Sequence, residues 1–227
     1  MKIALLGKGK TGGLVRDLHG EKETTIFDRA NPVTESKLLG HDIIISFLPA
    51  EAFMESLQTL MNSRIPVISG STGDIPLEKI HQELLEKSLS WIHGNNFSLA
   101  MTLLRSMLQK LGKITQLGGF HLSLSETHHS QKLDAPSGTA KSWKEWLGDD
   151  SLSIDSLREG DVVGIHSAIA QSTFERVTLT HEALDRKLFA QGALWAAERI
   201  HNGSPRRLGL ESFQSFVARE INLEETP

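Results

Sequence analysis

The chain has 227 residues, with 28 acidic against 24 basic side chains and a formal net charge of −4. This length suits one large domain or two small ones, and no basic surplus favours nucleic acid or an anionic membrane. Cysteine is absent, which excludes disulfides, thiolate metal sites and cysteine nucleophiles. Because the apolar runs are far shorter than the roughly 18 residues that cross a bilayer, we expect a soluble cytoplasmic protein without membrane partners.

The first hundred residues alternate short apolar strands with helical patterns. The pattern predicts strands over residues 2–6, 24–27, 42–48, 66–69 and 89–93, and helices from about residue 12, over 50–62 and from residue 76. Strands that alternate with helices indicate parallel βαβ units. We therefore expect an α/β fold whose residues 1–97 form a Rossmann-like, dinucleotide-binding domain.

The pattern changes after Asn96. It predicts a helix over 97–111, a strand over 120–125, two adjacent antiparallel strands over 162–169 and 176–180, and a helix over 187–201. These elements indicate a smaller α+β domain with a mixed or antiparallel sheet over residues 98–204. The tail from residue 205 has no clear period.

A glycine-rich turn follows the first strand. Gly7, Gly9 and Gly12 fit G-x-G-x-x-G, which lets the backbone approach a pyrophosphate at a helix N-terminus. Asp28 ends the second strand about 20 residues beyond Gly7, the spacing expected of an acid that binds the adenosine ribose. A dinucleotide site is the prediction, and a βα turn without ligand is the alternative. The loop lacks the leading glycine of a nucleotide triphosphatase.

Arg29 leaves the choice of dinucleotide open. An acid favours the free 2′-hydroxyl of NADH, whereas an arginine accommodates the 2′-phosphate of NADPH, so either cofactor or both are expected. Arg29 could equally be a solvated surface charge. The turns after the fourth and fifth strands lie where ligands of open α/β sheets bind. These turns either bind the cofactor or are simple connections. Their candidate cofactor residues are Gly70, Ser71, Thr72, Asn95, Asn96 and Phe97.

The densest polar stretch lies between the strand ending near residue 125 and the next helix. Its candidates for binding an anionic substrate are His128, His129, Lys132, Ser137, Gly138 and Thr139. The last three would form the first helical turn, whose N–H groups suit a carboxylate or phosphate. The lysine could supply the countercharge, and either histidine a proton donor near neutral pH.

Other roles for these residues are weaker. The adjacent histidines could bind a metal, but no third ligand is evident beside them, so no metal is expected. Ser137 could be an ordinary N-cap. A serine nucleophile lacks its G-x-S-x-G context.

The stretch from Glu126 to Ala140 closely resembles the hallmark of dihydrodipicolinate reductases, also named 4-hydroxy-tetrahydrodipicolinate reductases, of lysine and diaminopimelate biosynthesis. The resemblance implies reduction of 4-hydroxy-tetrahydrodipicolinate, a small dicarboxylate, to tetrahydrodipicolinate with NADH or NADPH. It makes His128 the proton donor and Lys132 a partner of the substrate carboxylate. It also adds Lys10, Thr11 and Phe47 to the cofactor residues. Finally, it implies a homotetramer built by sheets of the second domain, and a tail (205–227) that packs on the first.

The chain departs from the family pattern at several positions. Ser130 and Gln131 replace a basic pair, which removes positive charge near the substrate, and Thr11-Gly12 replace Arg-Met in the cofactor loop. The segment before Asp161 is short, as in the compact form of the family. Two alternatives therefore stay open: a reductase of a different small acid, and a non-catalytic dinucleotide-binding sensor.

Overall fold

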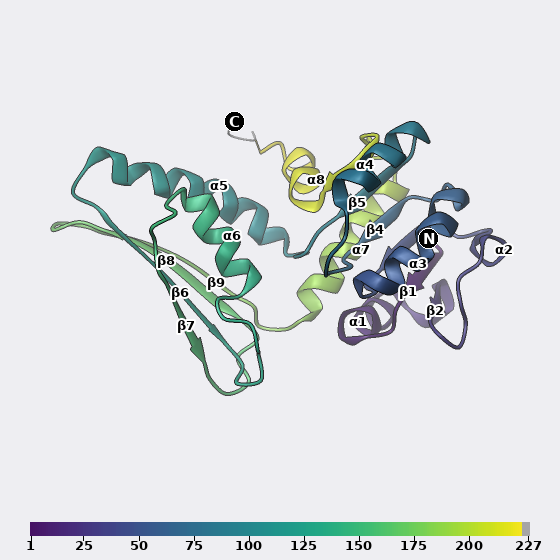
Figure 1. Ribbon diagram of the computed structural model, residues 1–227, viewed down its shortest axis with the longest axis horizontal. Helices are drawn as coiled ribbons and strands as arrows, with labels where there is room; N and C mark the ends of the chain where they lie inside the picture. Colours follow the sequence, from purple (N-terminus) through teal and green to yellow (C-terminus); the bar gives the residue numbers. More distant parts are fainter. Residues whose placement is uncertain (224–227) are drawn as a thin grey trace. The chain divides into compact units, whose positions relative to one another are not determined.

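The computed structural model describes residues 1–223, apart from the side chain of residue 116. The chain divides into two compact units (Figure 1). Of the described residues, the first unit contains 1–99 and 187–223, and the second contains 100–186. Within the described part of the chain, no helix is both long and apolar enough to cross a membrane.

The first unit is built on a parallel six-stranded sheet. In chain order its strands are β1 (Ile3–Leu6), β2 (Thr24–Phe27), β3 (Ile43–Ser46), β4 (Val67–Ser69), β5 (Ser90–His93) and β10 (Gly209–Ser212). They lie in the order β10-β5-β4-β3-β1-β2, and every neighbouring pair is parallel. β1 and β3 are buried at every position because helices cover both faces of the sheet, which explains their continuous apolar sequences.

Two groups of helices cover the faces of this sheet. α1 (Lys10–His19), α7 (Lys187–His201) and α8 (Phe213–Glu220) share one apolar cluster with the strands. α2 (Glu35–Leu38), α3 (Ala50–Ser63) and α4 (Leu77–Glu86) share the other. The predicted Rossmann-like arrangement is confirmed.

Helix α7 and the tail show where the predicted domain boundary is wrong. The predicted second domain includes residues 187–204, but α7 belongs to the first unit. Its small side chains, including Ala190 and Ala193, are fully buried there. A Cβ on Gly192 would lie 1.8 Å from the Phe97 carbonyl oxygen, so helix and loop meet at backbone distance. In the tail, β10 pairs with β5 and α8 follows directly.

The second unit carries a mixed four-stranded sheet. Its strands are β6 (His121–His128), β7 (Ile154–Arg158), β8 (Ile165–Gln171) and β9 (Arg176–Glu182), in the order β7-β6-β8-β9. β6 pairs parallel with β7 and antiparallel with β8. The predicted antiparallel pairing of β8 with β9 is confirmed, whereas β7 was not predicted.

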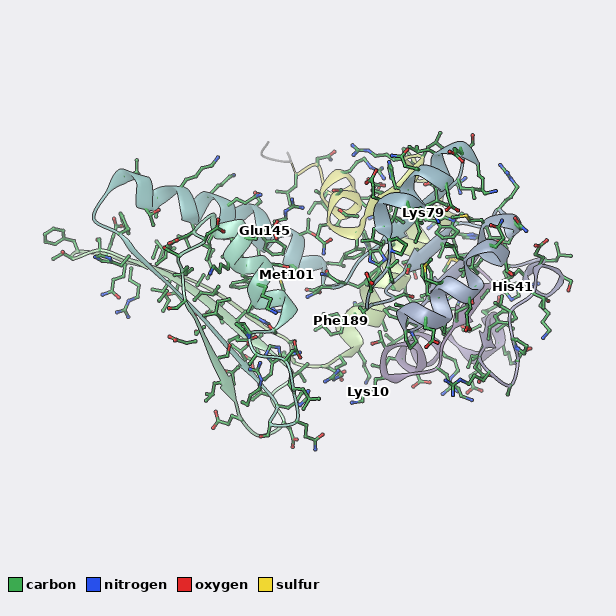
Figure 2. All side chains as sticks on the ribbon, viewed as in Figure 1. Lys10, His41, Lys79, Met101, Glu145 and Phe189 are labelled. Atoms are coloured by element: carbon green, nitrogen blue, oxygen red, sulfur yellow. The ribbon has the colours of Figure 1, made fainter. Side chains whose placement is uncertain are left out.

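Helices α5 (Leu99–Ile114) and α6 (Gly138–Leu147) pack on one face of the second sheet. Side chains from both helices, among them Met101, fill the space above the strands (Figure 2). Leu124, Ala168 and Ala170 are the buried strand residues of this core. Because side chains alternate along a strand, Glu126, His128 and His166 point to the same covered face.

Gly192 gives a test of this packing. We expect Gly192→Ala to destabilise the protein by roughly 1–3 kcal/mol, because the new methyl group would force α7 away from the Phe97 carbonyl. The matched control is Gly13→Ala in α1, where the nearest atom to a Cβ is 3.9 Å away. It should stabilise the helix by up to about 1 kcal/mol. Urea unfolding measures both, and equal effects would contradict the close contact.

Candidate functional site

The glycine-rich turn lies at the carboxyl edge of the first sheet, between β1 and α1. Gly7 has a φ of +90°, which favours glycine. A Cβ on Gly12 would lie 2.0 Å from the Gly7 carbonyl oxygen, so the turn folds directly onto the helix start. Gly9 is the N-cap of α1, and a Cβ there would meet nothing within 4 Å. The loop is therefore open where a pyrophosphate would approach the N–H groups of the helix.

Asp28 follows β2 at the same edge of the sheet. Its carboxylate accepts hydrogen bonds from the N–H groups of Ala30 and Asn31 and lies 2.7 Å from the Lys8 Nζ. The hydrogen bond from Lys8, together with the backbone N–H groups, lowers the pKa of Asp28. The carboxylate is therefore an ionised acceptor at neutral pH, as a ribose diol requires.

A pocket of about 290 Å³ opens beside Asp28. Its walls are mostly apolar, with the acid and Arg29 at one side, which suits an adenine ring and its ribose. The residues that line it are Leu6, Phe27, Asp28, Arg29, Pro32, Val33, Leu48, Ala52, Glu55, Ser56 and Thr59. The glycine turn and this pocket together fit a dinucleotide.

The turns after β3, β4 and β5 meet at this edge as well. A Cβ on Gly70 would lie 2.3 Å from the Phe47 ring, and the rings of Phe47 and Phe97 are 5.7 Å apart between centroids. Phe97 and Ser71 are almost fully buried, so their side chains pack inside the unit. Among the candidates on these turns, Thr72 and Asn95 are exposed, and so are Gly9, Lys10 and Arg29 elsewhere in the unit.

In the second unit, His128 is the last residue of β6. The prediction that the strand ends near residue 125 and that His128 lies in a loop is wrong. The strand continues beyond residue 125 with the same alternation. Glu126 and His128 therefore lie on the covered face and are only 2% and 8% exposed. A carboxylate in this position must be matched by charges and hydrogen bonds.

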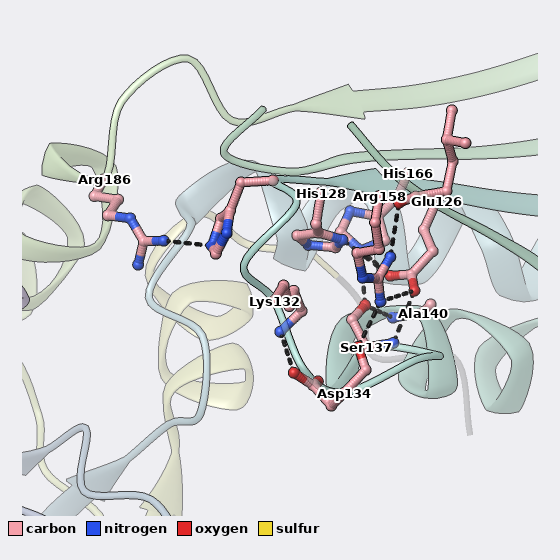
Figure 3. A network of polar contacts seen from close by, with 11 residues as sticks. Glu126, His128, Lys132, Asp134, Ser137, Ala140, Arg158, His166 and Arg186 are labelled. Atoms are coloured by element: carbon pink, nitrogen blue, oxygen red, sulfur yellow. Dashed lines mark hydrogen bonds and ion pairs between the residues drawn. The ribbon is translucent and has the colours of Figure 1, made fainter. Parts of the chain in front are cut away.

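The two oxygens of Glu126 are matched differently (Figure 3). Oε1 accepts two hydrogen bonds, whereas Oε2 makes only ion-pair contacts with two histidines, without hydrogen-bond geometry. Its Oε1 accepts hydrogen bonds from the Ser137 N–H at 2.9 Å and from the Arg158 Nη2 at 3.0 Å. Its Oε2 lies 3.2 Å from the His128 Nδ1 and 3.6 Å from the His166 Nε2. Burial alone would raise the pKa of Glu126, but the hydrogen bonds from Ser137 and Arg158 bring it down to about 2. The carboxylate is thus a fixed negative charge.

The two buried histidines differ in how readily they gain a proton. Burial, together with the neighbouring His128, lowers the pKa of His166 to about 4, so His166 is neutral at pH 7. The His166 Nε2 lies 3.2 Å from the Ser137 Oγ. Burial also lowers the pKa of His128, but Glu126 acts in the opposite direction. His128 is therefore the better proton carrier of the two.

The ligand atoms of Glu126, His128 and His166 lie within 4.8 Å of one another, a spacing that a metal site could have. The third ligand is not evident from the sequence, because Glu126 and His166 are not adjacent to the His128–His129 pair in a recognisable spacing. The surroundings of this cluster favour protons instead. Arg158 already neutralises Glu126, and its fixed charge opposes a dication. We interpret the cluster as a proton-carrying network.

The other candidate substrate residues surround this network. Lys132 Nζ lies 2.7 Å from Asp134, and His129 Nε2 accepts a hydrogen bond from Arg186 at 3.2 Å (Figure 3). The Lys132–Asp134 ion pair lies within the segment that follows β6, whereas the partner of His129 comes from the connection between β9 and α7.

Ser137 is the N-cap of α6. Its Oγ accepts a hydrogen bond from the Ala140 N–H, and its own N–H donates to Glu126. Ser137 is buried, so both of its polar groups serve the protein interior. The first N–H groups of α6, on Gly138 and Thr139, have no partner within the helix, because no helical carbonyl group precedes them. They are the groups that α6 offers to an anion.

Sequence reasoning missed Glu126, Arg158, His166 and Arg186 as parts of the site. The inward alternation of Leu122 and Leu124 could have placed Glu126 on the covered face. Arg158 comes from the unpredicted strand β7, and Arg186 from the connection between β9 and α7. The residues next to Arg158 and Arg186 in the sequence do not indicate that these arginines contact Glu126 and His129.

The fold and these two clusters define an α/β protein of the dinucleotide-binding type with a separate second sheet. The family model for the C-terminus of dihydrodipicolinate reductase matches residues 98–213. A protein of Christiangramia forsetii named 4-hydroxy-tetrahydrodipicolinate reductase is 32% identical over 220 residues, which cover 88% of this chain and 92% of the relative. One of the same name from Methanopyrus kandleri is 33% identical over 186 residues, covering 72% and 68%.

A solved structure shares the fold. It is a dipicolinate-bound dihydrodipicolinate reductase from Paenisporosarcina sp. TG-14, with a TM-score of 0.74 and 17% identity over 93% of this chain and 97% of that chain. At 17% identity this structure shows a shared fold, whereas the sequence matches show membership of a family. The chain belongs to the dihydrodipicolinate reductase family.

Proposed function

We propose that the protein reduces 4-hydroxy-tetrahydrodipicolinate to tetrahydrodipicolinate with NADH or NADPH, a step of lysine and diaminopimelate biosynthesis. The observation that carries this proposal is the His128–Glu126 pair close to Lys132 and the N-terminus of α6, in a chain whose relatives bear that reductase name. In this proposal the first unit binds the dinucleotide and the second binds the substrate.

The dinucleotide would be held by residues of the first unit. The turn from Gly7 to Gly12 would receive the pyrophosphate, and Asp28 the adenosine ribose. Lys8 and Arg29 place positive charge beside Asp28, which suits a 2′-phosphate and supports use of both cofactors. When bound, the reduced nicotinamide supplies a hydride. The turns that would surround it carry Phe47, Gly70, Ser71, Thr72, Asn95, Asn96 and Phe97.

The second unit would hold the dicarboxylate. Lys132, His129 and the N–H groups of Gly138 and Thr139 are its anion-binding groups, and Ser137 keeps the turn in place as a cap. The 4-hydroxyl must first leave as water, which gives a conjugated cyclic imine. Hydride addition to this imine then leaves negative charge on the ring, which the His128 imidazolium would neutralise by giving up its Nε2 proton. The substrate carboxylates raise the pKa of His128 on binding, because nearby negative charge favours the imidazolium.

We also propose a cytoplasmic homotetramer, assembled through the second sheet. Among the described residues of the second unit, no helix covers the face of that sheet away from α5 and α6, and this face exposes Leu157. Small hydroxyl side chains line it: Ser123, Ser125, Ser167, Thr178 and Thr180. Such a face suits sheet-to-sheet contact between copies of the chain.

The proposal is tested by the absorbance of NADH and NADPH, followed in parallel with purified protein. The substrate is made in place from pyruvate and aspartate semialdehyde by its synthase. We expect oxidation that requires the synthase product, and His128→Gln should lower kcat by on the order of 10²-fold or more while NADH still binds. NADH binding without any oxidation would contradict the proposed reaction and favour a different acid or a sensor.

Asp28 gives a separate test of the dinucleotide site. We expect Asp28→Ala to raise the dissociation constant of NADH by about tenfold, because a hydrogen bond to a charged group contributes about 1.5–3 kcal/mol. NADPH should lose less affinity, because Lys8 is released toward the 2′-phosphate. The matched control is Asp17→Ala on α1, an exposed acid paired with Arg16. Fluorescence titration measures each constant, and an unchanged value for NADH would contradict the ribose assignment.

A further inference from the structure

We propose that Glu126 is the positioning residue of the reaction: its Oε2 keeps a proton on the His128 Nδ1, so that the proton given to the substrate leaves from Nε2. The inference rests on the proposed function and extends it to a residue that does not touch the substrate. It assigns a role to the charge at the centre of the buried network.

The backbone of β6 sets the pairing. Glu126 and His128 are two residues apart on one strand, so their side chains point to the same face. Hydrogen bonds from the Ser137 N–H and the Arg158 guanidinium hold the Glu126 Oε1. These two bonds, from α6 and β7, restrain the carboxylate. Its Oε2 lies 3.2 Å from the His128 Nδ1, an ion-pair contact without hydrogen-bond geometry, so the effect of Glu126 on the ring is electrostatic.

The charge of Glu126 then decides which nitrogen keeps its proton. A carboxylate only accepts hydrogen bonds when ionised, so it favours N–H at the facing Nδ1 in both the neutral and the charged ring. The imidazolium can lose its Nε2 proton and relax to the tautomer that Glu126 already stabilises. The opposite tautomer would set a nitrogen lone pair against the carboxylate.

The Nε2 edge of the His128 ring borders Gly164, just before β8. A Cβ on Gly164 would lie 2.9 Å from that nitrogen, so any other residue there would press on the ring. Glycine is the residue that leaves the most room for the ring at this edge. The Nδ1 edge of the ring therefore faces the Glu126 carboxylate, and the Nε2 edge faces the glycine at residue 164.

Other charged groups also act on His128. Lys132 and Arg158 disfavour its imidazolium, whereas Glu126 and Asp134 favour it. His166 and, beyond it, His181 add imidazoles on the neighbouring strands, and His166 is neutral at pH 7. Glu126 is the carboxylate closest to the ring, so its removal lowers the pKa of His128.

The test compares Glu126→Gln and Glu126→Asp. In Glu126→Gln, the amide oxygen accepts from Ser137 and Arg158, which turns the NH2 group toward the His128 Nδ1 and moves the ring proton to Nε2. We expect kcat to fall by on the order of 10²-fold with little change in KM. The decline of kcat/KM with rising pH should move to lower pH, because the imidazolium loses its counterion.

Glu126→Asp keeps the charge but shortens the side chain. We expect it to be more active than Glu126→Gln and to keep the pH profile of the unchanged protein. A merely structural role predicts the reverse order, because glutamine preserves the size of the side chain and aspartate does not. The matched control is Glu145→Gln, the same change at an exposed position of α6. It should leave kcat unchanged.

Side-chain ¹⁵N NMR of histidine reads the tautomer without any turnover. In the unchanged protein, His128 should carry its proton on Nδ1, and in Glu126→Gln on Nε2, with the resonance assigned by its loss in His128→Gln. An unmoved proton, or a Glu126→Gln variant more active than Glu126→Asp, would overturn the inference. Absence of turnover in the unchanged protein would count against the proposed function alone, since the NMR result needs no substrate.

Discussion

One buried negative charge organises the polar interior of the second unit. Glu126 is 2% exposed, and an unmatched carboxylate in such a position would be strongly unfavourable. Its partners come from three different elements: Arg158 on β7, His166 on β8 and Ser137 at the start of α6. The charge therefore ties the strand order of the sheet to the placement of α6. It also fixes the segment between β6 and α6, which carries Lys132, because both of its ends are held.

Close backbone contacts play the corresponding part in the first unit. The turn after β1 meets the start of α1 at Gly12, the turn after β4 meets Phe47 at Gly70, and α7 meets the Phe97 carbonyl at Gly192. Each contact requires the absence of a side chain. Together they gather the turns at the carboxyl edge of a parallel sheet, where ligands of such sheets bind. In the first unit, glycines allow the close contacts that form the candidate site. In the second unit, the site depends on charges that match the buried Glu126.

The sequence alone was sufficient for features that depend on neighbouring residues. The apolar strands of the first sheet, the glycine turn and Asp28 follow from short-range patterns, and so does the polar segment that carries His128 and Lys132. Features that depend on residues far apart in the sequence could not be predicted from such short-range patterns. β10 is a four-residue strand whose partner β5 lies more than a hundred residues earlier, and α7 returns to the first unit although it follows the second in the chain. Glu126 looked like a loop residue because its compensating Arg158 lies on the unpredicted strand β7.

The central claim is that Glu126 is ionised and anchored at every pH at which the protein works. The most direct measurement is a ¹³C NMR titration of its side-chain carboxyl in glutamate-labelled protein, assigned by comparison with Glu126→Gln. The account predicts a pKa of about 2, so the resonance should stay at its ionised position down to the lowest pH at which the protein remains folded. A carboxyl that titrates near the ordinary glutamate value of about 4.3 would contradict it. The charge could then not hold the proton of His128 in place.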